Sequence, residues 1–61
     1  MNINEIINSA RIKYPISVFY KGYISEEEME ELEKYCDVHC GSVYMDGSGC
    51  YSIRHKEVKN E

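Results

Sequence analysis

The sequence predicts an α+β domain of two layers, with an αβαββ arrangement in which two helices pack on one face of a three-stranded mixed sheet. One capped amphipathic segment at 2–13 and another beginning at Ser25 predict the helices. Apolar and polar residues alternate at 16–22, 38–45 and 50–56, which predicts strands, and the turn signal DGSG joins the last two as a hairpin. Residues 1–61 are expected to form a single small domain with a frayed tail at 57–61.

The first helix carries its own start and stop signals. Asn2 is a favoured N-cap, Glu5 stands three residues later, and Met1 and Ile6 can close over the start as a hydrophobic staple. Pro15 disfavours helical geometry at the residue before it and ends the helix. Its apolar face is expected to consist of Ile3, Ile6, Ile7, Ala10 and Tyr14.

The second helix has the clearest local signal in the chain. Ser25 and Glu28 match a capping box, and glutamates fill the first turn, where the helix dipole favours negative charge. Its expected buried arc comprises Met29, Leu32, Tyr35 and Cys36. An acidic stripe lies nearly opposite and, given one further helical turn, comprises Glu26, Glu30, Glu33 and Asp37.

A strand, a helix and a second strand in succession imply a parallel crossover, to which the hairpin adds an antiparallel neighbour. The sheet face away from the helices is then partly bare, and Phe19, Val43 and Met45 are expected on it. Such a face invites a homodimer or another partner. The basic residues of the last segment are expected to mark a sheet edge; they are Arg54, His55, Lys56 and Lys59.

The charge balance favours protein partners over nucleic acid. Eleven acidic residues stand against seven basic ones, whereas a general nucleic-acid binder needs basic side chains to contact phosphates. No apolar run approaches the roughly 20 residues of a membrane-spanning helix, and no signal segment is visible at the start. We therefore expect a cytoplasmic protein that contacts neither nucleic acid nor a membrane directly.

Three cysteines and two histidines between residues 36 and 55 raise the question of a metal site. If Met45 pairs with Cys50, Cys40 faces His55 across the hairpin, but Cys50 and His39 point to the opposite side. A zinc module with the ligands Cys36, Cys40, His55 and either Cys50 or His39 therefore stays an alternative. The preferred interpretation is that the cysteines are structural thiols and that no cofactor is bound.

The same residues do not predict catalysis. Asp37, His39 and Cys40 diverge along a strand instead of converging, and Cys36 stands at a helix C-terminus beside Asp37, which opposes thiolate formation. We therefore expect no enzyme.

The stretch SEEEMEELE concentrates six glutamates, and outside them the chain carries five acidic and seven basic residues. The general explanation is a solvated helix face that aids solubility. The functional explanation is a row of carboxylates about 5 to 6 Å apart, a spacing comparable to that of phosphates along nucleic acid. The candidate protein-binding residues are Glu26, Glu27, Glu30, Glu31, Glu33 and Asp37, with Tyr23 and Tyr35 as aromatic anchors.

The opening MNINEII, followed by a lysine, a tyrosine and an extended stretch in IKYPISV, resembles the start of small acidic phage-encoded anti-CRISPR proteins that inhibit Cas9 by imitating DNA. The resemblance ends at about residue 20. In that family three strands precede two further helices, whereas here the acidic helix separates the first strand from the hairpin. No binding residue transfers. The resemblance implies a class: small inhibitors with an acidic surface that act in the host cytoplasm, with a CRISPR effector as a partner.

Together these observations predict a non-enzymatic protein-binding inhibitor whose acidic helix occupies a basic nucleic-acid-binding groove of its target. The zinc module is one alternative. A homo-oligomer with a structural or regulatory role, formed through the bare sheet face, is the other.

Overall fold

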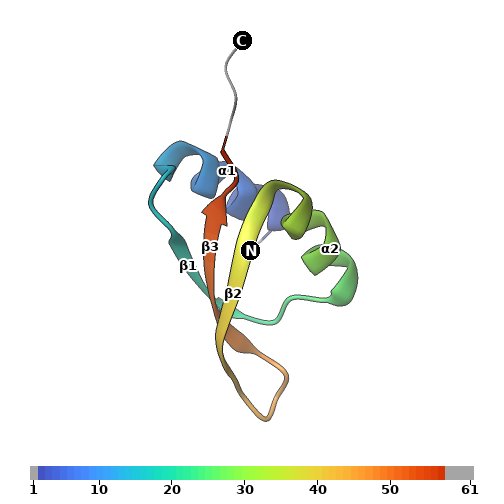
Figure 1. Cartoon of the computed structure of the whole chain (residues 1–61). Coiled ribbons are helices and arrows are strands. Elements are labelled where there is room, and N and C mark those ends of the chain that lie inside the picture. Colours follow the sequence, from blue (N-terminus) through green and yellow to red (C-terminus); the bar gives the residue numbers. More distant parts are fainter. Residues whose placement is uncertain (1, 58–61) are drawn as a thin grey trace.

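The computed structural model describes residues 2–57. Its elements follow in the order α1 (Ile3–Lys13), β1 (Val18–Gly22), α2 (Glu26–Tyr35), β2 (Cys36–Val43) and β3 (Gly49–His55). Both helices lie on one side of the sheet, and the β2–β3 hairpin extends beyond them (Figure 1). The predicted α+β class is confirmed. The predicted staple at Met1 and the tail beyond residue 57 lie outside the described residues.

Both helices begin where their capping signals predict. The Asn2 side chain accepts a hydrogen bond from the backbone N–H of Asn4 at 2.8 Å. At α2 both halves of the capping box are present, because Ser25 accepts from the N–H of Glu28 and the Glu28 carboxylate accepts from the N–H of Ser25. These bonds satisfy backbone donors that the first turn of a helix leaves free.

The predicted mixed sheet is wrong, because all strand pairs are antiparallel and the spatial order is β1–β3–β2. β1 and β2 run in the same direction, as the crossover predicts, but they do not pair. β3 is inserted between β1 and β2 and pairs with both. This topology is the split β-α-β arrangement. The basic residues Arg54 and His55 therefore lie on the central strand, and the prediction that they mark an edge is also wrong.

The hairpin register differs from the predicted one because the loop is centred earlier in the chain than expected. Val43 is opposite Gly49, and the connection closes with bonds from the Tyr44 N–H to the Ser48 carbonyl at 2.8 Å and from the Gly47 N–H to the Tyr44 carbonyl at 3.0 Å. Gly47 has φ 90°, which is typical of the last position of a three-residue hairpin loop. A bulge at Gly41 then changes the pairing, so that Cys40 is opposite Tyr51.

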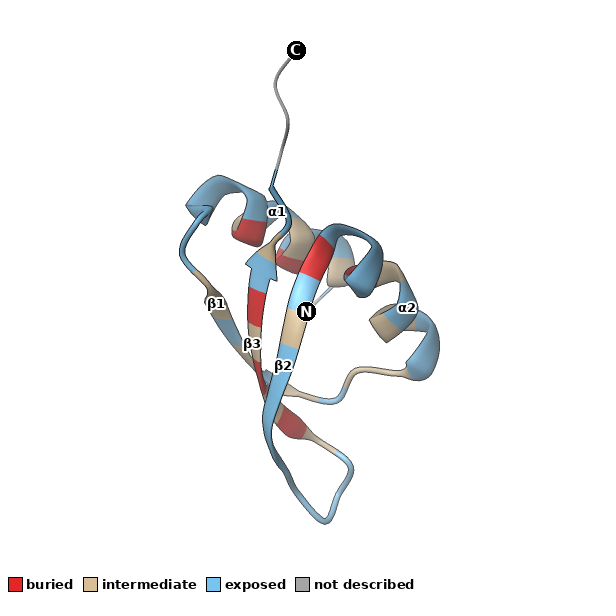
Figure 2. Cartoon of the chain, viewed as in Figure 1, coloured by how far each residue is buried: buried red, intermediate tan, exposed pale blue. Residues whose placement is uncertain are grey.

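A small apolar core lies between the helices and the sheet (Figure 2). α1 contacts β1 and β3, whereas α2 covers β2. The largest fully buried side chains come from α2, β2 and β3, and the buried set comprises Ile6, Ala10, Leu32, Cys36, Tyr51 and Ile53. Because Tyr51 and Ile53 face the helices, alternate residues of the three strands face the opposite side.

This opposite side, which we call the open face, is mostly polar. Phe19 projects from it with 83% of its surface exposed, beside Lys21, Ser52 and Arg54. The expectation that Val43 and Met45 also lie there is wrong, since the bulge turns Val43 to the helix side and Met45 belongs to the loop. A homodimer through this face stays a prediction. Phe19 is its most exposed large apolar side chain. The Tyr44 ring also borders the face, since its hydroxyl lies 3.2 Å from the Cys50 sulfur and the Lys21 ammonium lies 5.2 Å from the ring centre.

Leu32 has no exposed surface and holds α2 against the sheet. We expect Leu32→Ala to lower the free energy of unfolding by about 2 to 5 kcal/mol, because it leaves a cavity in the smallest part of a small core. Glu30→Ala on the exposed side of the same helix is the control and should change it by no more than about 0.5 kcal/mol. Urea denaturation measures both, and equal effects would contradict this packing.

Candidate protein-binding surface

The glutamates of α2 divide into two groups. Glu28 is used in the capping box, and Glu31 forms an ion pair with Lys34 at 3.1 Å. The other four are exposed and make no hydrogen bond or ion pair with any described residue. We call these four the acidic face: Glu26, Glu27, Glu30 and Glu33.

Two lysines among the described residues lie near the acidic face, Lys34 on the helix itself and Lys56, which lines a groove together with Glu33. Lys34 stands next to Glu33 in the sequence, and its ammonium donates a hydrogen bond to Glu31, which raises the pKa of Lys34. Glu30 of the acidic face also raises the pKa of Lys34, though less than Glu31 does, so Lys34 offsets part of the charge of the four carboxylates. The acidic face still presents a net negative charge to solvent.

Asp37 does not extend this stripe along the helix, as predicted, because α2 ends at Tyr35 and Asp37 belongs to β2. Its side chain lies on the open face, on the strand position opposite Arg54. The two residues form no ion pair: Arg54 instead donates to the Pro15 carbonyl at 3.0 Å and lies 5.5 Å from the centre of the Tyr14 ring. Arg54 is thereby directed toward the β1 side of the sheet.

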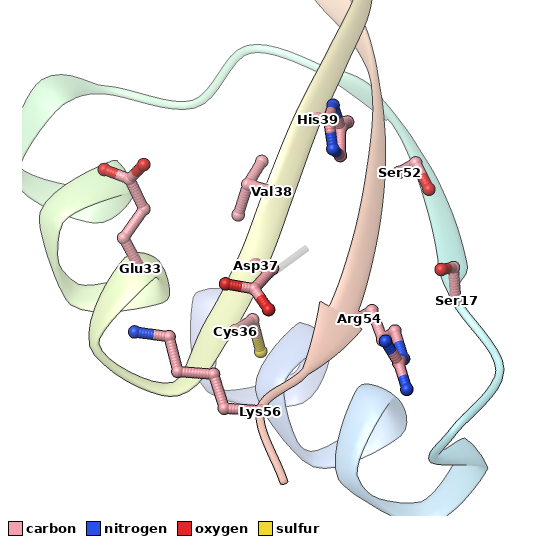
Figure 3. A pocket seen from close by; sticks show the side chains of 9 residues that line it. All are labelled: Ser17, Glu33, Cys36, Asp37, Val38, His39, Ser52, Arg54 and Lys56. Carbon is pink, nitrogen blue, oxygen red and sulfur yellow. The ribbon is translucent and has the colours of Figure 1, made fainter.

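Asp37 and Glu33 nevertheless line the same open groove (Figure 3). On the helix side the groove is lined by Glu33, Cys36 and Val38, on the open face by Ser17, Asp37, His39, Ser52 and Arg54, and at the end of β3 by Lys56. Because residues from both faces of β2 contribute, the groove wraps around the first half of that strand. It joins one end of the acidic face to Asp37.

The two candidate aromatic anchors are exposed but far apart. Tyr23 is 65% exposed and Tyr35 is 46% exposed. Tyr23 precedes α2 and lies against the hairpin turn at Gly47, whereas Tyr35 ends the helix. A helix of 10 residues spans about 15 Å. The tyrosines therefore flank the acidic face at its two ends and do not form one anchor pair.

The proposed zinc ligands do not converge. His55 is opposite Cys36, not Cys40 as predicted, and Cys50 lies on the open face opposite Ser42. All three cysteines are free, with Cys36 buried and Cys40 exposed. Within residues 2–57, no group of three or more His, Cys, Asp or Glu side chains is placed to hold a metal ion. The geometry does not support the zinc module.

The structure brings together three polar side chains that the sequence did not group. His39 is directly opposite Ser52, and Asp37 stands two residues from His39 on the same face (Figure 3). A nucleophile, its base and an orienting acid must be joined by hydrogen bonds. No hydrogen bond joins these three side chains in the described part of the chain. The cross-strand pairing that creates the group follows from the bulge at Gly41, which has no clear sequence signal.

Comparisons with known proteins found no matching family model, no similar curated protein and no similar solved structure. Over the described residues, no helix is long and apolar enough to cross a membrane.

Because the candidate zinc ligands lie apart, we expect the stability of the chain not to depend on a bound metal. Treatment with a chelator should leave the thermal unfolding midpoint unchanged, because small domains that depend on zinc unfold without it and the candidate ligands among the described residues do not converge on one point. Circular dichroism with and without the chelator measures this. A midpoint that falls on chelation, and is restored by added zinc, would contradict the expectation.

Burial raises the pKa of the Cys36 thiol above its ordinary value of 9.0, and the adjacent Asp37 carboxylate raises it further. The Cys36 thiol then ionises at lower pH in the unfolded chain than in the folded one. The free energy of unfolding should therefore fall as the pH rises through and above 9.0. Cys36→Ala should reduce this fall, whereas Cys40→Ala, at an exposed thiol, should not. Urea denaturation across this pH range measures the difference between the two variants, and equal slopes would count against it.

Proposed function

We propose that the chain is a non-enzymatic inhibitor that binds a protein partner through the acidic face of α2. The observation that supports this most is the set of four exposed carboxylates on one helix, in a chain whose other residues carry seven acidic and seven basic side chains and no net charge. A fixed helix presents these charges at lower conformational cost than a mobile acidic segment does, because its backbone is already ordered.

The partner that fits this surface has a basic groove of the kind that binds nucleic acid. Carboxylates on one side of a helix stand about 5 to 6 Å apart and can occupy positions that phosphates would take. Complementary charge then speeds association and makes it sensitive to salt. The N-terminal resemblance points to a CRISPR effector, with Cas9 as the first target to test, in the cytoplasm of the host cell.

Charge reversal tests this proposal. The double variant Glu30→Lys, Glu33→Lys should abolish inhibition of DNA cleavage by guide-loaded Cas9, because two of the four carboxylates of the acidic face become cations. The matched control Glu5→Lys, Glu57→Lys makes the same change in net charge at exposed positions outside α2. We expect the control to inhibit like the unmodified chain.

Two further readouts belong to this experiment. Inhibition by the unmodified chain should weaken as the salt concentration rises, since ionic contacts are screened. The proposal is wrong for Cas9 if the unmodified chain does not inhibit cleavage, and wrong about the surface if both double variants inhibit equally.

A further inference from the structure

The outer edge of β2 is the least protected part of the sheet. β2 has eight residues and β1 has five, and each has one edge without a neighbouring strand. β1 is short, carries Lys21 and follows Pro15, which are common means of preventing edge pairing. Along β2 the single formally charged residue is Asp37, and the bulge at Gly41 limits the regular edge to 36–40.

The backbone direction along this edge follows from one hydrogen bond. The N–H of Lys56 donates to the carbonyl of Tyr35 at 2.9 Å, which makes these two residues a hydrogen-bonded antiparallel pair. Since such pairs alternate, Asp37 and His39 direct their N–H and carbonyl groups toward β3. Val38 and Cys40 then direct theirs outward, where no described residue pairs with them.

From this geometry we infer that the outer edge of β2 binds an extended, basic segment of a partner protein, which adds as a fourth strand. Backbone pairing to Val38 and Cys40 supplies the main-chain contacts of such a strand. The inference deepens the proposed function and rests on it for the basic character of the partner.

Charge at the edge favours a basic segment. α2 covers β2, so a strand added outside β2 lies on the side of the acidic helix. Glu33 and Asp37 line the groove around β2, and Arg54 is held toward β1 by Pro15 and Tyr14. Lys56 is the remaining cation that lines the groove. Lys56 offsets one of the two carboxylates, so the charge that favours basic side chains on the added strand comes from the other carboxylate and from the rest of the acidic face.

The same charge disfavours a second copy of this chain at the edge. Pairing of β2 with β2 of another copy would place two α2 helices next to each other across a two-fold axis. Each helix carries four exposed glutamates, and like charges at an interface are strongly unfavourable. The acidic helix thus protects the edge from self-pairing and leaves it open to a basic strand.

A synthetic peptide of alternating lysine and valine, as long as β2, is the probe. In hydrogen exchange followed by NMR, the peptide at about 100 times its Kd should slow exchange of the Val38 and Cys40 amides about 100-fold. The same peptide with N-methylated backbone amides on the edge that faces β2 should give no protection, since it cannot donate. A peptide of alternating glutamate and valine should not bind.

A pair of variants at one exposed position provides the matched control. Cys40→Pro removes an outward N–H and should weaken peptide binding about tenfold, the loss of one hydrogen bond, whereas Cys40→Ala should bind as the unmodified chain does. If Cys40→Pro fails to fold, the N-methylated peptide still decides the question, because it leaves the protein unchanged.

The outcomes separate this inference from the proposed function. The peptide could bind without protecting Val38 and Cys40, and lose this binding in the Glu30→Lys, Glu33→Lys variant. This result overturns the edge inference and still supports the acidic face as the binding surface. Protection of both amides without Cas9 inhibition supports the edge and counts against the proposed target. A dimer with both amides protected in the absence of peptide overturns the inference, because a second copy then occupies the edge.

Discussion

The sheet is held together through β3, because β1 and β2 each pair with β3 and not with each other. The same strand supplies Tyr51 and Ile53 to the core, between the strands and the two helices. Both layers of the domain therefore depend on β3 lying between β1 and β2. So small a domain buries only about 60% of the surface of its unfolded chain, so few other contacts could compensate for the loss of this central strand.

The position of β3 also determines which surfaces are accessible to a binding partner. It makes β2 an outer strand, places α2 over that strand and leaves the open face with a mostly polar surface. The acidic face, the groove at Glu33 and Asp37 and the free β2 edge consequently lie on one side of the molecule. Glutamates thus stand beside an outer strand whose one formally charged residue, Asp37, is also acidic, and this is the surface that the proposed basic partner would contact.

Local features of the fold were predictable, because caps and helical spacing act within a few residues. Asn2, Ser25 and Glu28 begin their helices as their residue types indicate. The strand order was not predictable, since insertion of β3 depends on contacts between residues far apart in sequence. The pairing register of β2 and β3 was predicted incorrectly for a more specific reason. DGSG indicates that a turn is present, but the sequence does not show that Gly47 takes the left-handed conformation or that a bulge occurs at Gly41.

The candidate site was predicted in part. The exposed glutamates follow directly from helical spacing, and Leu32 on the opposite side is buried as expected. Asp37 belongs to the same stripe only if α2 has one further turn, but α2 ends at Tyr35 and β2 begins one residue later. The pairing of Glu31 with Lys34, which removes one glutamate from the surface, depends on rotamers that spacing alone does not determine.

Residue-resolved hydrogen exchange of the free monomer tests the central position of β3 most directly. With β3 between two neighbours, amides all along β3 should be protected, while β2 should alternate, with slow exchange at Asp37 and His39 and fast exchange at Val38 and Cys40. Protection of Val38 and Cys40 in the monomer, together with fast exchange on one side of β3, would mean that β1 and β2 pair directly, and would contradict the account.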